Sequence, residues 1–173
     1  MKRRHLLFVM VAAVIAASWT DALFAQRGRG PGRGFGGRND PAFAEDHEVF
    51  FFLLANGDKI KREIKNLENG VETLTESDDA KVAAKIQQHV AAMYSRVEDI
   101  RPIHMRDPLF REIFRNAEKI DLQHEKTDKG VRVVETSDDP YVAKLIQEHA
   151  KVVSQFIKNG HAELRKNHTP PSP

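Results

Sequence analysis

The chain has 173 residues, of which 40% are hydrophobic and 30% charged, so it has enough apolar side chains for a folded core and is not wholly disordered. It contains no cysteine, which excludes disulfide bonds, thiolate metal sites, a cysteine nucleophile and covalent haem attachment through a CxxCH motif. The formal net charge is only +2 at pH 7, so charge alone predicts no general polyanion-binding surface.

The N-terminus has the pattern of a secretory signal peptide over residues 1–25. Basic residues precede an apolar run from Leu6 to Trp19, and Ala22 and Ala25 are alternative residues before the cleavage site. The run has 14 residues, fewer than the ~20 needed to span a bilayer, so we expect cleavage and no transmembrane span afterwards. The sequence therefore predicts an exported protein, either periplasmic or secreted.

Residues 26–39 form a Gly- and Arg-rich segment, and residues 161–173 end in a proline-rich stretch. Neither has enough apolar side chains to offset the entropy cost of ordering, so we expect a flexible arm and a frayed C-terminal tail. The arm is typical either of polyanion-binding RGG-like segments or of a solvated spacer. For an exported protein we favour the spacer and expect no nucleic-acid partner.

The chain repeats itself at an offset of 60 positions. Residues 47–96 align with residues 107–156 without a gap, and 14 of the 50 aligned positions are identical. The densest block, S-D-D-x-x-V-A-x-x-I-Q-x-H, occurs in both copies. The sequence therefore predicts an internal duplication, with repeat 1 at 40–98 and repeat 2 at 107–160 forming one domain.

The first element of each copy is predicted to be a helix. Asp40-Pro41 and Asp107-Pro108 each place an N-capping acid before a proline at the first helical position. Apolar residues then recur at a helical spacing in both copies. We expect the first of these helices over about residues 41–56.

The middle of each copy is predicted to be a β-hairpin, because apolar residues alternate there in the second copy. Asn69-Gly70 and Lys129-Gly130 predict the turns. A second helix follows, with Asp79 and Asp139 as N-caps of an apolar stripe. We therefore expect an α+β fold of tandem duplicated α-β-β-α units, in which a four-stranded antiparallel sheet carries the helices on one face.

No motif in the sequence predicts catalysis. The paired acids of the S-D-D block precede helices and are best explained as caps, rather than as a Ca²⁺ loop or an acid–base pair. The sequence lacks the motifs of serine hydrolases, P-loop nucleotide enzymes, dinucleotide-binding proteins and zinc proteases. A non-enzymatic protein is therefore favoured over an enzyme.

Three histidines are candidates for a metal or haem site. His89 and His149 are repeat mates on equivalent helices, and His47 lies on the apolar face of the first helix, so we expect all three to point inward. Their imidazoles could bind Zn²⁺ or Cu²⁺ with an open position, or two of them could ligate haem, with Met93 as a further cofactor-binding residue. The alternative is that these imidazoles are simply hydrogen-bonded in the core.

The segments DDPYVAKLIQEHAKVVSQF, NGVETLTESDD and DPLFREIF resemble a family of exported bacterial proteins that has no assigned activity. The resemblance covers about residues 47–160. It implies a secreted, internally duplicated domain and carries no catalytic assignment.

Two hypotheses for the function follow. The first is an extracytoplasmic, non-enzymatic binding protein that holds a metal or non-covalent haem through its inward-facing histidines. The second is a structural or interaction module of the cell envelope, which uses an exposed patch of Phe51 and Phe52 and the basic arm to bind a partner protein or an envelope polyanion. A second copy of the chain, giving a homodimer, is a further candidate partner. Because Arg111 and Glu112 replace these phenylalanines in the second copy, we expect the patch either to be covered by residues 39–46 or to be a contact surface.

Overall fold

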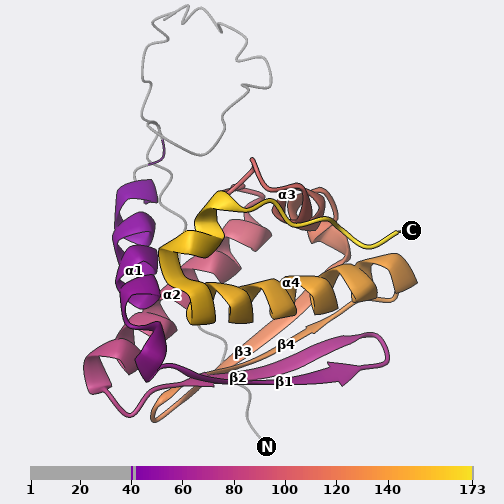
Figure 1. Ribbon diagram of the computed structural model, residues 1–173. Helices are drawn as coiled ribbons and strands as arrows, with labels where there is room; N and C mark the ends of the chain where they lie inside the picture. The colour runs from indigo at the N-terminus through magenta and orange to yellow at the C-terminus, as the bar shows by residue number, and fades with distance from the viewer. Residues whose placement is uncertain (1–39, 41, 173) are drawn as a thin grey trace, which may run out of the picture. The chain divides into compact units, whose positions relative to one another are not determined.

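The computed structural model describes residue 40 and residues 42–172. The predicted signal peptide and basic arm lie outside these residues. Figure 1 shows a sheet that carries the helices on one of its faces. The described part is an α+β domain with four α-helices and a four-stranded antiparallel sheet in the order β1-β2-β4-β3.

The second half of the described chain repeats the element order of the first half. The α-helices are α1 (Phe43–Ala55), α2 (Ala80–Glu98), α3 (Pro108–Arg115) and α4 (Pro140–Asn159). The strands are β1 (Lys61–Leu67), β2 (Gly70–Glu76), β3 (Asp121–Thr127) and β4 (Gly130–Thr136). Short 3-10 helices are η1 (Gly57–Lys59), η2 (Ala117–Lys119) and η3 (Gly160–Arg165). Both strands of the second hairpin begin 60 residues after their counterparts.

Three of the four predicted helix caps are confirmed. The side chain of Asp79 accepts hydrogen bonds from the backbone N–H groups of Lys81 and Val82, and Asp139 caps α4 in the same way. Asp107 accepts one at the start of α3, where a proline follows it. Each cap satisfies backbone donors that have no partner inside the helix. These acids therefore start helices, as the sequence predicts.

The start of α1 differs from the prediction. The helix begins at Phe43 rather than near residue 41, and no side chain caps it. The carboxylate of Asp40 accepts a hydrogen bond from the backbone N–H of Ala42, just before the helix, at 3.0 Å. It also ion-pairs with Arg96 of α2 at 2.7 Å, and Asp46 ion-pairs with the same guanidinium at 2.6 Å. Arg96 is only 1% exposed, and a buried cation requires counter-charges. Asp40 thus neutralises a buried arginine as well as preceding a helix.

Each hairpin turns one residue earlier than predicted. The turn residues are Glu68-Asn69 and Asp128-Lys129, and Gly70 and Gly130 are already the first residues of β2 and β4. A Cβ atom at either glycine would lie 2.0 Å from a backbone oxygen of the facing central strand. Glycine is therefore required here by the close approach of two strands, not by the turn.

The second helix of each half packs on the hairpin of the other half. Gln87 of α2 donates hydrogen bonds to the carbonyl oxygens of Thr127 and Gly130, at 2.9 and 3.2 Å. Gln147 of α4 makes the equivalent bonds to the first hairpin, at 2.9 and 3.0 Å. Because each half completes the other, we expect the described domain to unfold as a single unit.

The end of the described chain is not frayed. His168 is held between two carboxylates, with Nδ1 at 2.6 Å from Asp107 Oδ2 and Nε2 at 3.0 Å from Glu163 Oε1. Its carbonyl oxygen accepts a hydrogen bond from the backbone N–H of Leu109. We call Asp107, Glu163 and His168 the C-terminal clasp. Sequence composition misses the clasp because it depends on acids from two distant segments.

Candidate functional site

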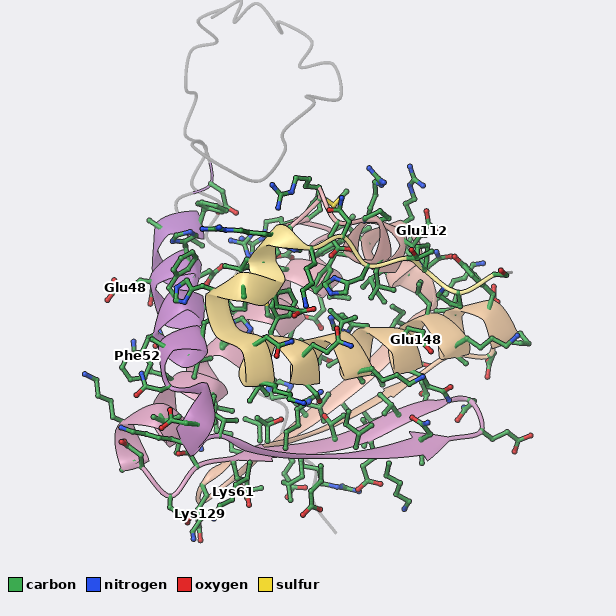
Figure 2. The ribbon with its side chains drawn as sticks, in the orientation of Figure 1. Glu48, Phe52, Lys61, Glu112, Lys129 and Glu148 are labelled. Atoms are coloured by element: carbon green, nitrogen blue, oxygen red, sulfur yellow. The ribbon has the colours of Figure 1, made fainter. Side chains whose placement is uncertain are left out.

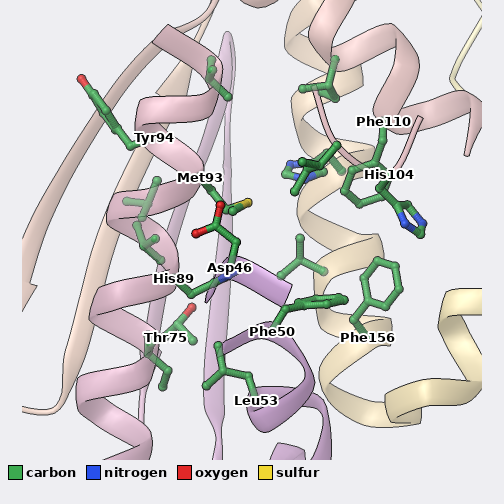
Figure 3. Close-up of a pocket in the computed structure, with 18 of the residues that line it drawn as sticks. Asp46, Phe50, Leu53, Thr75, His89, Met93, Tyr94, His104, Phe110 and Phe156 are labelled. Carbon is green, nitrogen blue, oxygen red and sulfur yellow. The ribbon is translucent and has the colours of Figure 1, made fainter. Parts of the chain in front are cut away.

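A cavity of about 640 Å³ lies between the sheet and the helices. Its wall is mainly aliphatic and aromatic and takes side chains from all four α-helices and all four strands. Figure 3 shows Phe50 of α1, Met93 of α2 and Phe156 of α4 around this space. Pockets for small molecules measure roughly 300–1,000 Å³ and have the same apolar character. The cavity therefore has the size and lining of a small-molecule site.

Three phenylalanines form the aromatic part of the wall. The ring of Phe156 meets those of Phe50 and Phe110 edge to face, with centroids 5.8 and 6.0 Å apart. Phe50 and Phe110 occupy equivalent positions in the two halves, on α1 and α3. Edge-to-face pairs of this kind are favourable and fix ring orientation. These rings thus join α1, α3 and α4 in one aromatic cluster at the point where the two halves meet.

The predicted imidazoles of His89 and His149 do line the cavity. The ring of His89 stacks on Phe50 at 5.6 Å, and the ring of His149 meets Phe110 edge to face at 5.2 Å. The Nδ1 atom of His89 is buried without a hydrogen-bond partner. His89 therefore lacks the hydrogen bond that a buried imidazole nitrogen usually makes.

Burial keeps both of these imidazoles uncharged. It lowers the pKa of His89 to about 4, and the charge of Asp46 offsets only part of that effect. Burial likewise lowers the pKa of His149 to about 4, with a further lowering from the positive charge of Arg62. At neutral pH each ring therefore offers one N–H donor and one nitrogen lone pair.

A charged pair enters the cavity wall from the sheet. Arg62 of β1 lies opposite Thr75, and Glu135 of β4 lies opposite Val71, so both share the helix-facing side with those buried residues. Burial lowers the pKa of Arg62 to about 10 and raises the pKa of Glu135 to about 7. At neutral pH Arg62 is charged, whereas Glu135 is close to half protonated.

The structure does not bring the three predicted histidines together as metal ligands. Among the described residues no group of three or more His, Cys, Asp or Glu side chains could hold a metal ion. The prediction that His47 points inward is wrong, because this residue is exposed at the edge of the cavity, with its ring stacked on Phe51 at 4.1 Å. Met93 lines the cavity together with His89 and His149, so all four predicted residues border one space, with His47 at its exposed edge.

Arg62 and Glu135 line the cavity although the sequence pattern does not mark them as site residues, and His104 of the linker between the two halves lines it too. The sequence contains a signal for Arg62, since its repeat mate at the same inward position is the apolar Leu122. The ring of His104 packs against Phe110 at 4.9 Å. His104 lies in a loop and has a positive φ of 53°. The spacing of residues in the sequence does not predict this backbone conformation.

The expected exposed phenylalanine patch is half-buried. Phe51 lies between His47 and His161, at ring distances of 4.1 and 4.9 Å. Phe52 packs against the core, and the ammonium group of Lys81 lies 5.1 Å from its ring. Neither residue is among the exposed large hydrophobics of the described chain. Part of the cover of these rings comes from His161 of η3 and Lys81 of α2.

Charged side chains outside the cavity are paired along the surface. Lys61 and Lys129 both bond the carboxylate of Asp78 at 2.6 Å, and this lowers the pKa of Asp78 to about 2. Figure 2 shows the two lysines together at one end of the sheet. These exposed pairs account for the polar cluster of the S-D-D block without a ligand.

No family model, curated protein or solved structure matches the chain. Within the part that the structure describes, every helix is too short or too polar to cross a membrane. A functional assignment therefore depends on the cavity and its polar groups.

Proposed function

We propose that this protein is an exported, internally duplicated binding protein whose cavity holds a small, mainly apolar molecule. The observation that carries the proposal is the cavity of about 640 Å³ with its apolar wall. The cavity is partly open to solvent, and its mainly apolar wall would bury the apolar surface of a small molecule. An occupant would recover the dispersion contacts that the wall lacks.

The proposed duplication accounts for the place of the cavity. Thr73 and Val133 are repeat mates and lie directly opposite each other in the central strand pair. An approximate twofold axis of the two halves would pass between them, and both residues line the cavity. The space therefore lies where the helices of the two halves meet over the centre of the sheet. The signal-peptide pattern of residues 1–25 supports export.

Filling the cavity tests the proposal. We expect 1-decanol to displace the neutral dye Nile red from the wild-type protein in a saturable way, followed by fluorescence. Met93→Trp adds bulk to the cavity wall and should weaken both ligands at least tenfold. Ser95→Trp adds the same side chain to an exposed position of α2 and serves as the matched control. Equal binding by both folded variants, or no saturable binding by the wild type, would contradict the proposal.

Haem is a second candidate ligand, favoured by the uncharged imidazoles of His89 and His149 and by Met93 on the same wall. An uncharged imidazole nitrogen can ligate haem iron. We expect a Soret band shift when haem is added to the wild type, and its loss in the His89→Ala/His149→Ala variant, with 1-decanol binding retained. An unshifted Soret band in the wild type excludes haem. Elemental analysis of the purified protein tests separately whether Zn²⁺ or Cu²⁺ is bound.

A further inference from the structure

Arg62 differs from the other buried cations in the described chain. Arg96 has two carboxylates within 2.7 Å, and each ring nitrogen of His168 has one within 3.0 Å. Arg62 donates from Nη1 to the hydroxyl group of Thr75, and its Nε atom is buried with no partner. A buried cation that no carboxylate contacts directly is unfavourable unless a ligand supplies that contact.

The fold does not require a charge at this position. Leu122 occupies the equivalent place on β3, where an apolar side chain faces the same cavity. Thr75, the hydrogen-bond partner of Arg62, has Glu135 as its own repeat mate. Arg62 and Glu135 thus put charged groups on one side of the cavity, whereas the equivalent positions on the other side carry uncharged residues. This asymmetry gives an occupant a defined orientation.

The other titratable groups of the cavity wall offset the charge of Arg62 only in part. The opposite charge of Glu135 attracts Arg62, but among the described residues no hydrogen bond or ion pair joins these two side chains. Asp46 is paired with Arg96, and Glu135, with a pKa of about 7, is close to half protonated at neutral pH. Burial lowers the pKa of His104, as it does for the cavity imidazoles, so these rings are uncharged. The remaining titratable wall residues are His47, Tyr94 and Arg106.

We infer that the ligand is an amphiphilic monocarboxylate, whose carboxylate binds the guanidinium of Arg62 and whose apolar chain lies against Phe50, Phe110 and Phe156. This inference rests on the proposed function, because it assigns a polar end to the molecule that the cavity holds. A guanidinium binds a carboxylate through parallel N–H donors. The unpartnered Nε of Arg62 and one of its terminal nitrogens are suited to that geometry. The aromatic wall would take up the alkyl chain.

Calorimetric titration with ligands of equal chain length tests the inference. At pH 6.5, where a simple carboxylic acid is ionised, we expect decanoate to bind the wild type at least tenfold more tightly than 1-decanol, and decyltrimethylammonium to bind most weakly. Adding one methylene to either series should tighten binding by about fourfold. Equal affinity for decanoate and 1-decanol would overturn the inference and leave the proposed function intact. Failure of both to bind would overturn the proposed function itself.

Variants of one strand identify the residue responsible. Arg62→Leu copies Leu122, so the fold should tolerate it, and we expect it to lose the preference for decanoate while still binding 1-decanol. Arg62→Lys keeps the charge and should retain part of the preference. Lys65→Gln removes a cation from the exposed face of the same strand and should leave the affinities for decanoate and 1-decanol unchanged. An unchanged preference in folded Arg62→Leu would show that Arg62 does not bind the carboxylate.

Glu135 provides an independent readout. Its carboxyl group ionises as the pH rises through about 7, and the new negative charge would repel a bound carboxylate. We expect decanoate binding to weaken several-fold between pH 6 and pH 8.5 in the wild type and much less in Glu135→Gln. The same pH series with 1-decanol should be nearly flat. An equal loss of affinity for decanoate and 1-decanol over this pH range would contradict the inference that the carboxylate of the ligand binds close to Glu135.

Discussion

The cavity and the C-terminal clasp both bury ionisable side chains, but they treat them in opposite ways. In the clasp, His168 contacts Asp107 and Glu163, and Glu163 also accepts hydrogen bonds from Asn159 and Lys166. In the cavity, polar nitrogens remain without partners. The contrast separates charges that hold the chain together from polar groups that a ligand can still reach.

The pKa values show the same contrast. Burial disfavours the charged form of His168, yet its hydrogen bonds to Glu163 and Asp107 more than offset this and raise its pKa. The bonds from Lys166 and His168 in turn lower the pKa of Glu163 to about 2. His89 has only the distant charge of Asp46 to oppose burial, and its pKa falls to about 4. The pKa of a buried histidine in this protein therefore depends on its hydrogen-bond partners as well as on its burial.

The largest expected effect is on stability, and it should appear in the clasp. His168→Ala leaves two buried carboxylates without their shared partner, and we expect it to lower the free energy of unfolding by about 3–5 kcal/mol. Arg62→Leu replaces an unpaired buried charge with an apolar side chain and should leave the free energy of unfolding equal or higher. Urea denaturation at pH 7 measures both changes.

Lys166→Ala is the control for the clasp. This lysine also bonds Glu163, but its side chain is 57% exposed, so its loss should cost less than about 1 kcal/mol. If His168→Ala and Arg62→Leu lowered the free energy of unfolding by similar amounts, the clasp and the cavity would not differ in how their buried charges affect stability.

A smaller effect should appear in the pH dependence of stability. Between pH 6.5 and pH 4 the unfolded chain binds a proton at His89 and at His149 that the folded protein excludes, so stability falls as the pH falls. Glu135 acts in the opposite direction over part of this range, because its raised pKa favours the folded state at lower pH. Replacing one imidazole with leucine should reduce the loss between pH 7 and pH 4.5 by on the order of 2 kcal/mol.

The control for this measurement is His124→Leu, since His124 is exposed on β3. Urea denaturation at a series of pH values gives the slopes. An unchanged slope in both His89→Leu and His149→Leu would mean that these imidazoles are not held uncharged by the cavity.

Local signals in the sequence predicted the elements well. The caps at Asp79, Asp107 and Asp139 depend only on residues within one helical turn, so sequence spacing was sufficient to find them. The hairpins were also predicted, but Gly70 is explained by the carbonyl oxygen of a strand some 65 residues away. Asp40 likewise serves Arg96, a contact between distant segments. Long-range contacts of this kind leave no local pattern.

The site was predicted in part for the same reason. His89 and His149 share an apolar stripe with a helical period, and this placed them inward. His47 lies on a similar apolar stripe of α1, but this helix is at the edge of the helical layer. The His47 ring is therefore exposed, although the sequence pattern is the same. Arg62 and Glu135 were missed because a charged residue in a strand is normally assigned to the solvent face.

The sequence by itself determined the periodic elements, their caps and their recurrence after 60 residues, because each depends on neighbours along the chain. Only the tertiary structure decided which side chains surround the cavity and which buried charges find partners. That decision depends on how two halves with different polar residues pack against each other. Arg62 and Leu122 occupy equivalent strand positions 60 residues apart, and only the packing of the two halves brings their different side chains to one shared cavity.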